Sequence, residues 1–259
     1  MGAHSKVGAD SKLTPITTYK ADRDYLAEYK ITFQLEAENL VDNVWTDQPP
    51  VPKNKVMKLD VKFTGKTAQE KSAVIATKLH SIGATALVVT TLDDIAWLLN
   101  LRGSDIAYNP VFFAYLLFIS HKNGGVWRLY IDSDKTVDVT EHLELDGVTV
   151  HPYQQITADL EGLHALNGHV IAYDGNACNY MLYEAMENRD RVSSPALVAR
   201  IKAVKNPVET AGMKFCQYRD GAAVVRYLAC LEKELEKGEN PELTEYTGAE
   251  VLEKFRSVG

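Results

Sequence analysis

The sequence has few cysteines, and their arrangement excludes a disulfide framework. Its three cysteines are far apart and form no CxxC pair; they are Cys178, Cys216 and Cys230. An odd number of widely spaced cysteines favours a reducing compartment, so we expect a cytoplasmic protein. None of the three stands beside a cation at a predicted helix start, and ordinary thiols are therefore expected rather than a nucleophile.

Long hydrophobic segments are also lacking. The longest apolar run, residues 111–119, is less than half of the roughly 20 residues that a helix needs to cross a bilayer. Residues 1–10 contain no apolar stretch of the kind found in secretory signals, and a ragged terminus is the interpretation that we favour. No membrane association is expected.

A basic surface stripe is the third feature that is missing. The chain has 28 Lys and Arg against 35 Asp and Glu, a net charge of -7, and its cations are scattered among acids. This distribution argues against a nucleic acid partner. The 46% of hydrophobic and 24% of charged residues are typical of a folded protein, and 259 residues suffice for one domain plus part of another.

What is present is a regular alternation of predicted strands and helices from residue 56 onward. The clearest helix is 67–82, which begins with the capping box of Thr67 and Glu70 and ends at Gly83. Hydrophobic runs and turn residues predict the other elements: strands at 57–63, 86–91, 111–119, 126–132, 148–150 and 169–173, and helices at 92–99, 141–145, 154–166 and 177–187.

The order of these elements predicts an α/β fold. The segment HKNGG joins two of the strands, 111–119 and 126–132, as a hairpin, so this part of the sheet should be antiparallel. Elsewhere strands alternate with helices, which indicates parallel pairing. We therefore expect a mixed sheet covered on both faces by helices.

Both ends of the chain differ from this pattern. Residues 20–45 read as a helix that leads into the proline-rich segment WTDQPPVPKNK, a candidate linker. At the other end, Asn206 as N-cap, Pro207 at the first position and Glu209 predict a long helix over 207–236. A second unit is expected to begin near residue 198.

No familiar catalytic motif accompanies this fold. The chain contains no P-loop, G-x-G-x-x-G, G-x-S-x-G or H-E-x-x-H sequence. Its seven histidines never pair at a spacing typical of metal ligands within one element. His142, between Glu141 and Glu144, could join a metal site, but a solvated acidic turn is the favoured interpretation.

The most unusual segment is TTLDDIAWLLNLRGSDIAYNPVFFAY, residues 90–115. Polar side chains gathered between apolar runs after a strand often mark a loop that faces a ligand. Here they include Asp94, Arg102, Asp105 and Asn109. The alternative is local packing, in which Asp94 caps a helix and Arg102 pairs with Asp105; the two interpretations remain open at this point.

Three segments together carry a family resemblance. ENLVDNVWTDQPPVP, the 90–115 segment and RIKAVKNPVE occur in the order and spacing of the cytosolic three-domain Xaa-Pro aminopeptidases, which this chain resembles from about Lys20 to its end. Members of that family remove the N-terminal residue from peptides whose second residue is proline. The resemblance implies two creatinase-like domains followed by a catalytic domain of the pita-bread fold.

The resemblance also implies a domain assignment and a missing metal site. Residues 1–55 would be a tail, a helix of the preceding domain and a linker, 56–197 the creatinase-like middle domain, and 198–259 the opening helices of the catalytic domain. The two-manganese site of the family uses two Asp, one His and two Glu, none of which can be assigned here. We therefore expect this chain alone to be inactive and the full-length enzyme to be a homodimer.

One functional role carries over as a hypothesis. In relatives such as creatinase, an arginine of the corresponding domain reaches the active site of a neighbouring subunit, so Arg102 is the candidate substrate contact, with Asp105 and Asn109 as orienting groups. Two alternatives remain: a non-catalytic interaction module built on the same fold, and a prolidase-type or creatinase relative.

Overall fold

The computed structural model describes residues 4–121, 124–163, 168–187, 190–238 and 240–257. These residues divide into two compact units, one of residues 1–61 with 66–204 and one of residues 62–65 with 205–259. The contact boundary lies after Val204, a few residues beyond the predicted domain start at 198, and the predicted domain limits stay a prediction. Among the described helices, none is long and apolar enough to span a membrane.

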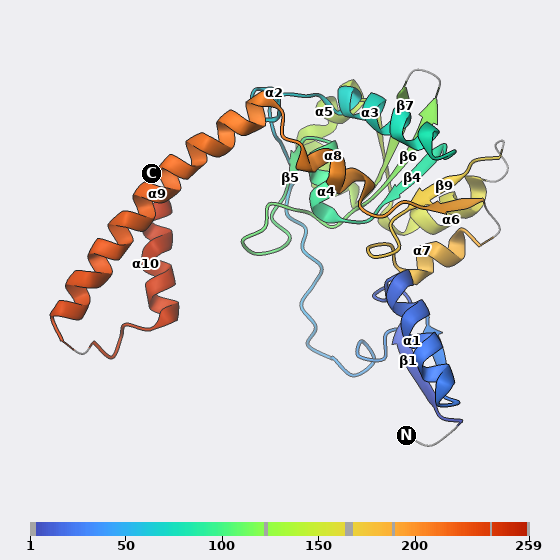
Figure 1. Ribbon diagram of the computed structural model, residues 1–259, viewed down its shortest axis with the longest axis horizontal. Helices are drawn as coiled ribbons and strands as arrows, with labels where there is room; N and C mark the ends of the chain where they lie inside the picture. The colour runs from blue at the N-terminus through green and yellow to red at the C-terminus, as the bar shows by residue number, and fades with distance from the viewer. Residues whose placement is uncertain (1–3, 122–123, 164–167, 188–189, 239, 258–259) are drawn as a thin grey trace. The chain divides into compact units, whose positions relative to one another are not determined.

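The first unit is built around a six-stranded sheet in the order β10-β9-β4-β6-β7-β8 (Figure 1). Its strands are β4 (Ala86–Val89), β6 (Tyr115–His121), β7 (Gly124–Tyr130), β8 (Val148–His151), β9 (Ile171–Tyr173) and β10 (Arg191–Ser193). β6 pairs antiparallel with both β4 and β7, whereas the three other neighbouring pairs are parallel. The predicted mixed sheet and the hairpin pairing are confirmed, while the turn residues 122–123 lie outside the described residues.

Helices cover both faces of this sheet, and alternate strand residues explain why. Along β4, Leu87 and Val89 point into one core and Ala86 and Val88 into the other. The first core is completed by α3 (Ala68–Ser81), α4 (Leu92–Leu98), α5 (Thr140–Leu145) and α8 (Leu197–Ala203), and the second by α1 (Ile16–Glu28), α6 (Ile156–Gly162) and α7 (Tyr180–Ala185).

The helix predicted over residues 20–45 is wrong. The chain instead forms β1 (Lys6–Asp10), α1 and β2 (Thr32–Glu36), and the two strands pair in parallel. The helix ends at Glu28 because Lys30 takes a left-handed conformation with φ of 57°. Residues 6–10 are therefore a paired strand, where we had favoured a ragged terminus over residues 1–10, and residues 1–3 lie outside the described residues. The segment that follows β1 is tied to α7 by hydrogen bonds such as Met181 N to Ser11 O, 3.1 Å.

The start and end of α3 agree with the signals predicted from sequence. Thr67 and Glu70 form the predicted capping box of α3, and Gly83 has the expected positive φ of 71°. The strand predicted at 57–63 is shorter: β3 covers Met57–Lys58 and is followed by the one-turn helix α2 (Val61–Thr64). Two 3₁₀ segments, η1 (Ser133–Val139) and η2 (Tyr153–Gln155), follow β7 and β8 respectively.

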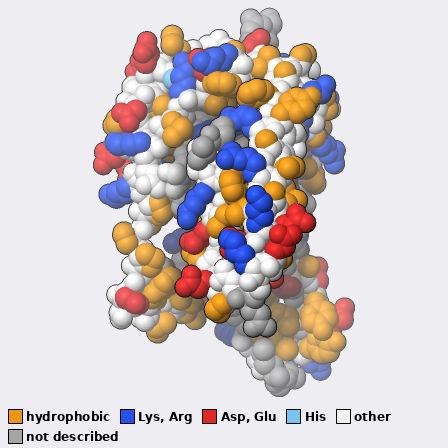
Figure 2. Space-filling view, turned by 90° about the vertical axis from the view of Figure 1, so that its left-hand side faces the viewer, with side chains coloured by type: hydrophobic (Ala, Val, Ile, Leu, Met, Phe, Trp, Pro, Cys, Tyr) orange, Lys and Arg blue, Asp and Glu red, His pale blue; other side chains and the backbone are white. Residues whose placement is uncertain are grey.

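The second unit contains the long helix α9 (Pro207–Glu236) and α10 (Glu245–Ser257). α9 starts as predicted, because the Asn206 side chain accepts the Glu209 N–H while the Glu209 side chain accepts the Asn206 N–H. Figure 2, which faces α9 and α10, shows hydrophobic side chains at the surface among Lys and Arg. Phe215, Tyr218 and Val225 of α9 are all more than three-fifths exposed.

Candidate functional site

The polar segment of residues 90–115 connects β4 to β6 through α4, the short strand β5 (Leu101–Arg102) and a projecting loop. β5 pairs antiparallel with β3, which places Arg102 opposite Met57. The loop closes by backbone hydrogen bonds from Gly103 N to Pro110 O, 3.2 Å, and from Asp105 N to Val111 O, 3.1 Å. This ladder gives the loop a defined base.

Arg102 lies half-buried at the base of this loop. Its Nη1 donates to Leu101 O at 2.8 Å and to Ala96 O at 3.2 Å, and burial lowers the pKa of the guanidinium. No carboxylate of the described residues lies within ion-pair distance of it. A guanidinium has five N–H donors, so Nε and Nη2 keep donors for an external acceptor.

The pair of Arg102 and Asp105, which we offered as the local-packing alternative, does not form. The Asp105 carboxylate instead makes an ion pair with Lys135 of η1 and accepts the Phe113 N–H at 2.7 Å. Its side chain is completely buried, and its Oδ1 has no hydrogen-bond partner among the described residues. Asp105 therefore fastens the loop to the body of the domain.

Asn109 contributes to the loop through its backbone. Its N–H donates to Ile106 O at 3.1 Å and its carbonyl accepts Val111 N–H at 2.8 Å, which makes a tight turn around Tyr108. Tyr108 has a φ of 63° and is 97% exposed. A bulky residue in this conformation is strained, and such strain is commonly found at ligand contacts and switch regions.

A buried polar network beneath β5 was missed by sequence reasoning. Asn100, at a φ of 53°, donates from Nδ2 to Lys66 O at 2.8 Å, and its Oδ1 accepts from Lys71 Nζ at 2.5 Å. Lys71 also donates to Trp97 O at 2.5 Å and lies 4.4 Å from the centre of the Trp97 ring. Lys71 is only 2% exposed and Asn100 only 1%.

The signal for this network was present in the sequence. Lys71 falls on the stripe of Ala68, Ile75 and Leu79, which α3 turns toward the core. A lysine on such a stripe must find acceptors inside the protein, because burying an unpaired ammonium is very unfavourable. The Asn100 side chain and the carbonyl end of α4 supply them.

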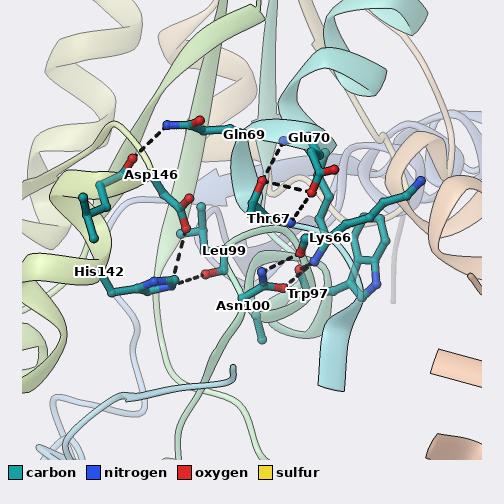
Figure 3. Close-up of polar contacts among 12 residues, drawn as sticks. Lys66, Thr67, Gln69, Glu70, Trp97, Leu99, Asn100, His142 and Asp146 are labelled. Atoms are coloured by element: carbon teal, nitrogen blue, oxygen red, sulfur yellow. Dashed lines mark hydrogen bonds and ion pairs between the residues drawn. The ribbon is translucent and has the colours of Figure 1, made fainter. Parts of the chain in front are cut away.

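His142 belongs to the same region, and the solvated turn expected there is wrong. As Figure 3 shows, its ring points toward Leu99 and Asp146; Nε2 lies 3.0 Å from Leu99 O and 3.6 Å from Asp146 Oδ2. The two side chains are about one-tenth exposed, and burial raises the pKa of Asp146. His142 thus provides a partner for the carbonyl of Leu99, the C-cap residue of α4.

Acidic residues at the start of α4 hold α8 in place. The ammonium of Lys202 forms ion pairs with Asp93 and Asp94, and the Asp94 carboxylate also accepts from the Thr91 hydroxyl at 2.7 Å. Although burial opposes the charge of Lys202, the hydrogen bonds that its ammonium donates to the two carboxylates raise its pKa. Asp94 therefore links the start of α4 to α8 through Lys202.

A metal centre finds no support in the described part of the chain. No group of three His, Cys, Asp or Glu side chains there is arranged to hold a metal ion. The two manganese ions implied by the resemblance do not fit these residues, and no chemical step is assigned to a metal here.

The fold and this loop define an α/β domain of the creatinase type, a class whose sheet is mixed and flanked by helices. Residues 47–209 match the model of the Creatinase/Prolidase N-terminal domain, and the chain belongs to that family. The match includes the Pro-rich linker, the polar loop and the start of α9.

Curated relatives agree with this assignment. The chain is 38% identical over 264 residues to a probable Xaa-Pro aminopeptidase P of Laccaria bicolor, covering 99% of this chain and 40% of that protein. It is 35% identical to Xaa-Pro aminopeptidase ApepP of Drosophila melanogaster, covering 98% of this chain and 41% of that protein. The chain thus spans about two-fifths of the length of these relatives.

Solved structures give the same picture. The X-prolyl aminopeptidase of Caenorhabditis elegans, described as a cytosolic enzyme with a di-nuclear active site, superposes with a TM-score of 0.90 at 30% identity; the match covers all of this chain and 42% of that one. The Xaa-Pro dipeptidase of Bacillus anthracis matches at a TM-score of 0.53 and 16% identity, which shows a shared fold alone.

Proposed function

We propose that this chain is the creatinase-like part of an Xaa-Pro aminopeptidase, a metallopeptidase that removes the N-terminal residue from peptides with proline in second position. The observation that carries the proposal is the likeness to the Caenorhabditis elegans enzyme along the whole chain, at a TM-score of 0.90. A likeness to the fold alone would not support an activity, but identities of 35–38% to named aminopeptidases favour one.

In this proposal the catalytic metals are held outside the present chain. Residues 198–259 would be the opening helices of the catalytic domain, and 56–197 the domain that precedes it. The exposed apolar side chains of α9 support this assignment, since a helix with such a surface usually packs against further structure. Two manganese ions, a homodimeric enzyme and a cytoplasmic location belong to the same proposal.

Arg102 is the residue of this chain that we propose to contact substrate. Its half-buried guanidinium has unused donors, and the loop that follows it is fixed by Asp105 and projects to Tyr108. A fixed cation of this kind can bind a peptide carbonyl or carboxylate without first losing side-chain freedom. Asp105 and Asn109 would act indirectly, by holding the loop.

The test is Arg102→Ala in the intact enzyme, with Arg23→Ala on the exposed face of α1 as the matched control. We expect the first variant to lower kcat/KM for Xaa-Pro peptides by about tenfold or more, because a charge-assisted hydrogen bond is worth roughly 1.5–3 kcal/mol. The control should leave it unchanged. If kcat and KM both stay at their original values in Arg102→Ala, the proposed contact is wrong.

A further inference from the structure

A hollow of 780 Å³ lies at one end of the sheet, beside the Asp105–Lys135 ion pair. Its walls come from residues 51–53, 131–135 and 150–154, together with Phe113. The stretch 131–135 directly follows β7, and the stretch 150–154 contains the last residues of β8 and those after it. Because β7 and β8 are parallel, the hollow lies at the carboxyl ends of both strands. Ligands of α/β proteins commonly bind at this end of a sheet, in cavities of about 300–1,000 Å³.

The walls of this hollow are largely apolar and held in place by their neighbours. Tyr153 packs against Tyr115 with ring centres 4.8 Å apart, and His151 packs against Tyr130 at 5.4 Å. Phe113 is fixed through its backbone N–H, which the buried Asp105 carboxylate accepts. These rings therefore form a prearranged surface for another ring or an apolar side chain.

One wall is a proline-containing segment of the chain itself. Val51, Pro52 and Lys53 line the hollow, and Pro49 and Pro50 precede them. Directly after this segment the chain is anchored, because Asn54 Nδ2 donates to Ser104 O at 2.8 Å and Val56 N to Lys135 O at 2.8 Å. A proline-containing stretch of the chain thus forms one wall of the hollow.

The polar groups at the rim are suited to a ligand rich in acceptors. Two of these groups already have partners: the Lys135 ammonium forms an ion pair with Asp105, and the Asp132 carboxylate accepts the Asp134 N–H. Lys53 and Gln154 carry N–H donors for which the described residues provide no acceptor. Proline offers a carbonyl but no N–H, so a proline-rich peptide presents acceptors to such donors and rings to the aromatic walls.

We propose that this hollow binds an extended, proline-containing peptide, which lies beside residues 51–53 with its rings on Phe113 and Tyr153 and its carbonyls toward Lys53 and Gln154. Extended proline-rich segments lose little conformational freedom on binding, and grooves lined by aromatic rings recognise them in other proteins. No catalytic centre takes part in this binding, so it stands or falls separately from the aminopeptidase proposal.

The experiment is a fluorescence-anisotropy titration of the 259-residue chain with the labelled peptide acetyl-(Ala-Pro-Pro)₃-amide. Its blocked ends exclude recognition of a free terminus. The control peptide has serine in place of every proline. We expect saturable binding of the first peptide, and binding of the second that is at least about tenfold weaker.

Two variants locate the binding, and one serves as a control. Gln154→Ala, at an exposed position, should weaken binding by about fivefold, and Tyr153→Ser by about tenfold, from the loss of a hydrogen bond and of ring contacts respectively. Tyr25→Ser, on α1 outside the hollow, should leave the affinity unchanged. The proposal is overturned if neither peptide binds, if both bind equally, or if Gln154→Ala and Tyr153→Ser bind as well as the original chain.

Discussion

Lys71 Nζ lies 2.5 Å from Asn100 Oδ1 and 4.4 Å from the centre of the Trp97 ring, and Lys71 and Asn100 are both at most 2% exposed. The contact joins α3 to the residue that immediately precedes β5. Because Arg102 is in β5, the position of the proposed substrate contact depends on Asn100, two residues before it, which is held by the buried ammonium group of Lys71.

Removing the side-chain amide of Asn100 should therefore destabilise the folded chain. Asn100→Ala takes away an acceptor of Lys71 and the donor to Lys66 O, and it places a Cβ-bearing residue without side-chain hydrogen bonds at a φ of 53°. We expect the free energy of unfolding to fall by about 2–4 kcal/mol. Urea unfolding followed by circular dichroism measures it. Asn176→Ala, at an exposed turn, should change it by less than about 0.5 kcal/mol.

The ion pair between Asp105 and Lys135 provides a second test of the loop's base. Asp105→Ala leaves a buried ammonium without its carboxylate and should lower the free energy of unfolding by about 3–5 kcal/mol. The double variant Asp105→Ala with Lys135→Met should recover part of this loss, because it removes the unpaired charge. Urea unfolding of the original chain, of Asp105→Ala, of Lys135→Met and of the double variant forms a double-mutant cycle, and additive effects would show that the two side chains do not interact.

The cap of α9 tests the start of the second unit. Asn206 accepts the Glu209 N–H at 2.9 Å and donates to Thr64 O at 2.8 Å. Asn206→Ala should destabilise this unit by about 1 kcal/mol, and Asn206→Asp by less, because aspartate can still accept the N–H. Hydrogen exchange of the first turn of α9 reports the loss; equal protection in Asn206→Ala and the original chain would contradict the observed cap.

A pH dependence follows from the buried carboxyl of Asp146. Burial raises its pKa in the folded state above the ordinary value of 3.8, so the folded chain binds this proton more tightly than the unfolded chain. Its contribution to stability is then present at low pH and lost as the pH rises from about 4 through the raised pKa. Asp146→Asn should become progressively more stable relative to the original chain over that range.

Unfolding measured between pH 3 and pH 7 checks this sign. Asp47→Asn, an exposed replacement in the linker, serves as the matched control and should follow the original chain at every pH. A difference between Asp146→Asn and the original chain that stays constant, or that changes in the opposite direction, would show that the carboxyl is not destabilised by burial.

The features that could be predicted from sequence are those that depend on neighbouring residues. The capping boxes at Thr67 and Asn206 need only a partner three positions away, and both form. The hairpin of β6 and β7 is similarly local. The terminal β1–α1–β2 arrangement was missed because the pairing of β1 with β2 spans α1, and no short-range pattern specifies it.

The polar contacts of the loop were also harder to predict from sequence, because their partners are distant along the chain. Asp105 and Arg102 are close in sequence, and a pair between them was one of the two interpretations left open, yet the Asp105 carboxylate pairs with Lys135, thirty positions away. Lys71 falls on the buried stripe of Ala68 and Ile75, but its acceptor Asn100 lies twenty-nine positions away. Spacing can indicate that such a side chain is buried, but in both cases the partner is set by long-range packing, which composition and spacing do not encode.

The most direct test of the central claim is an assay of the purified 259-residue chain with manganese and a peptide that begins Ala-Pro. If the chain is the creatinase-like part of an Xaa-Pro aminopeptidase whose metal ligands lie elsewhere, release of alanine should not exceed that of a sample without protein, at any manganese concentration. Release of alanine that depends on the chain, saturates with peptide and is abolished by a chelator would contradict the claim.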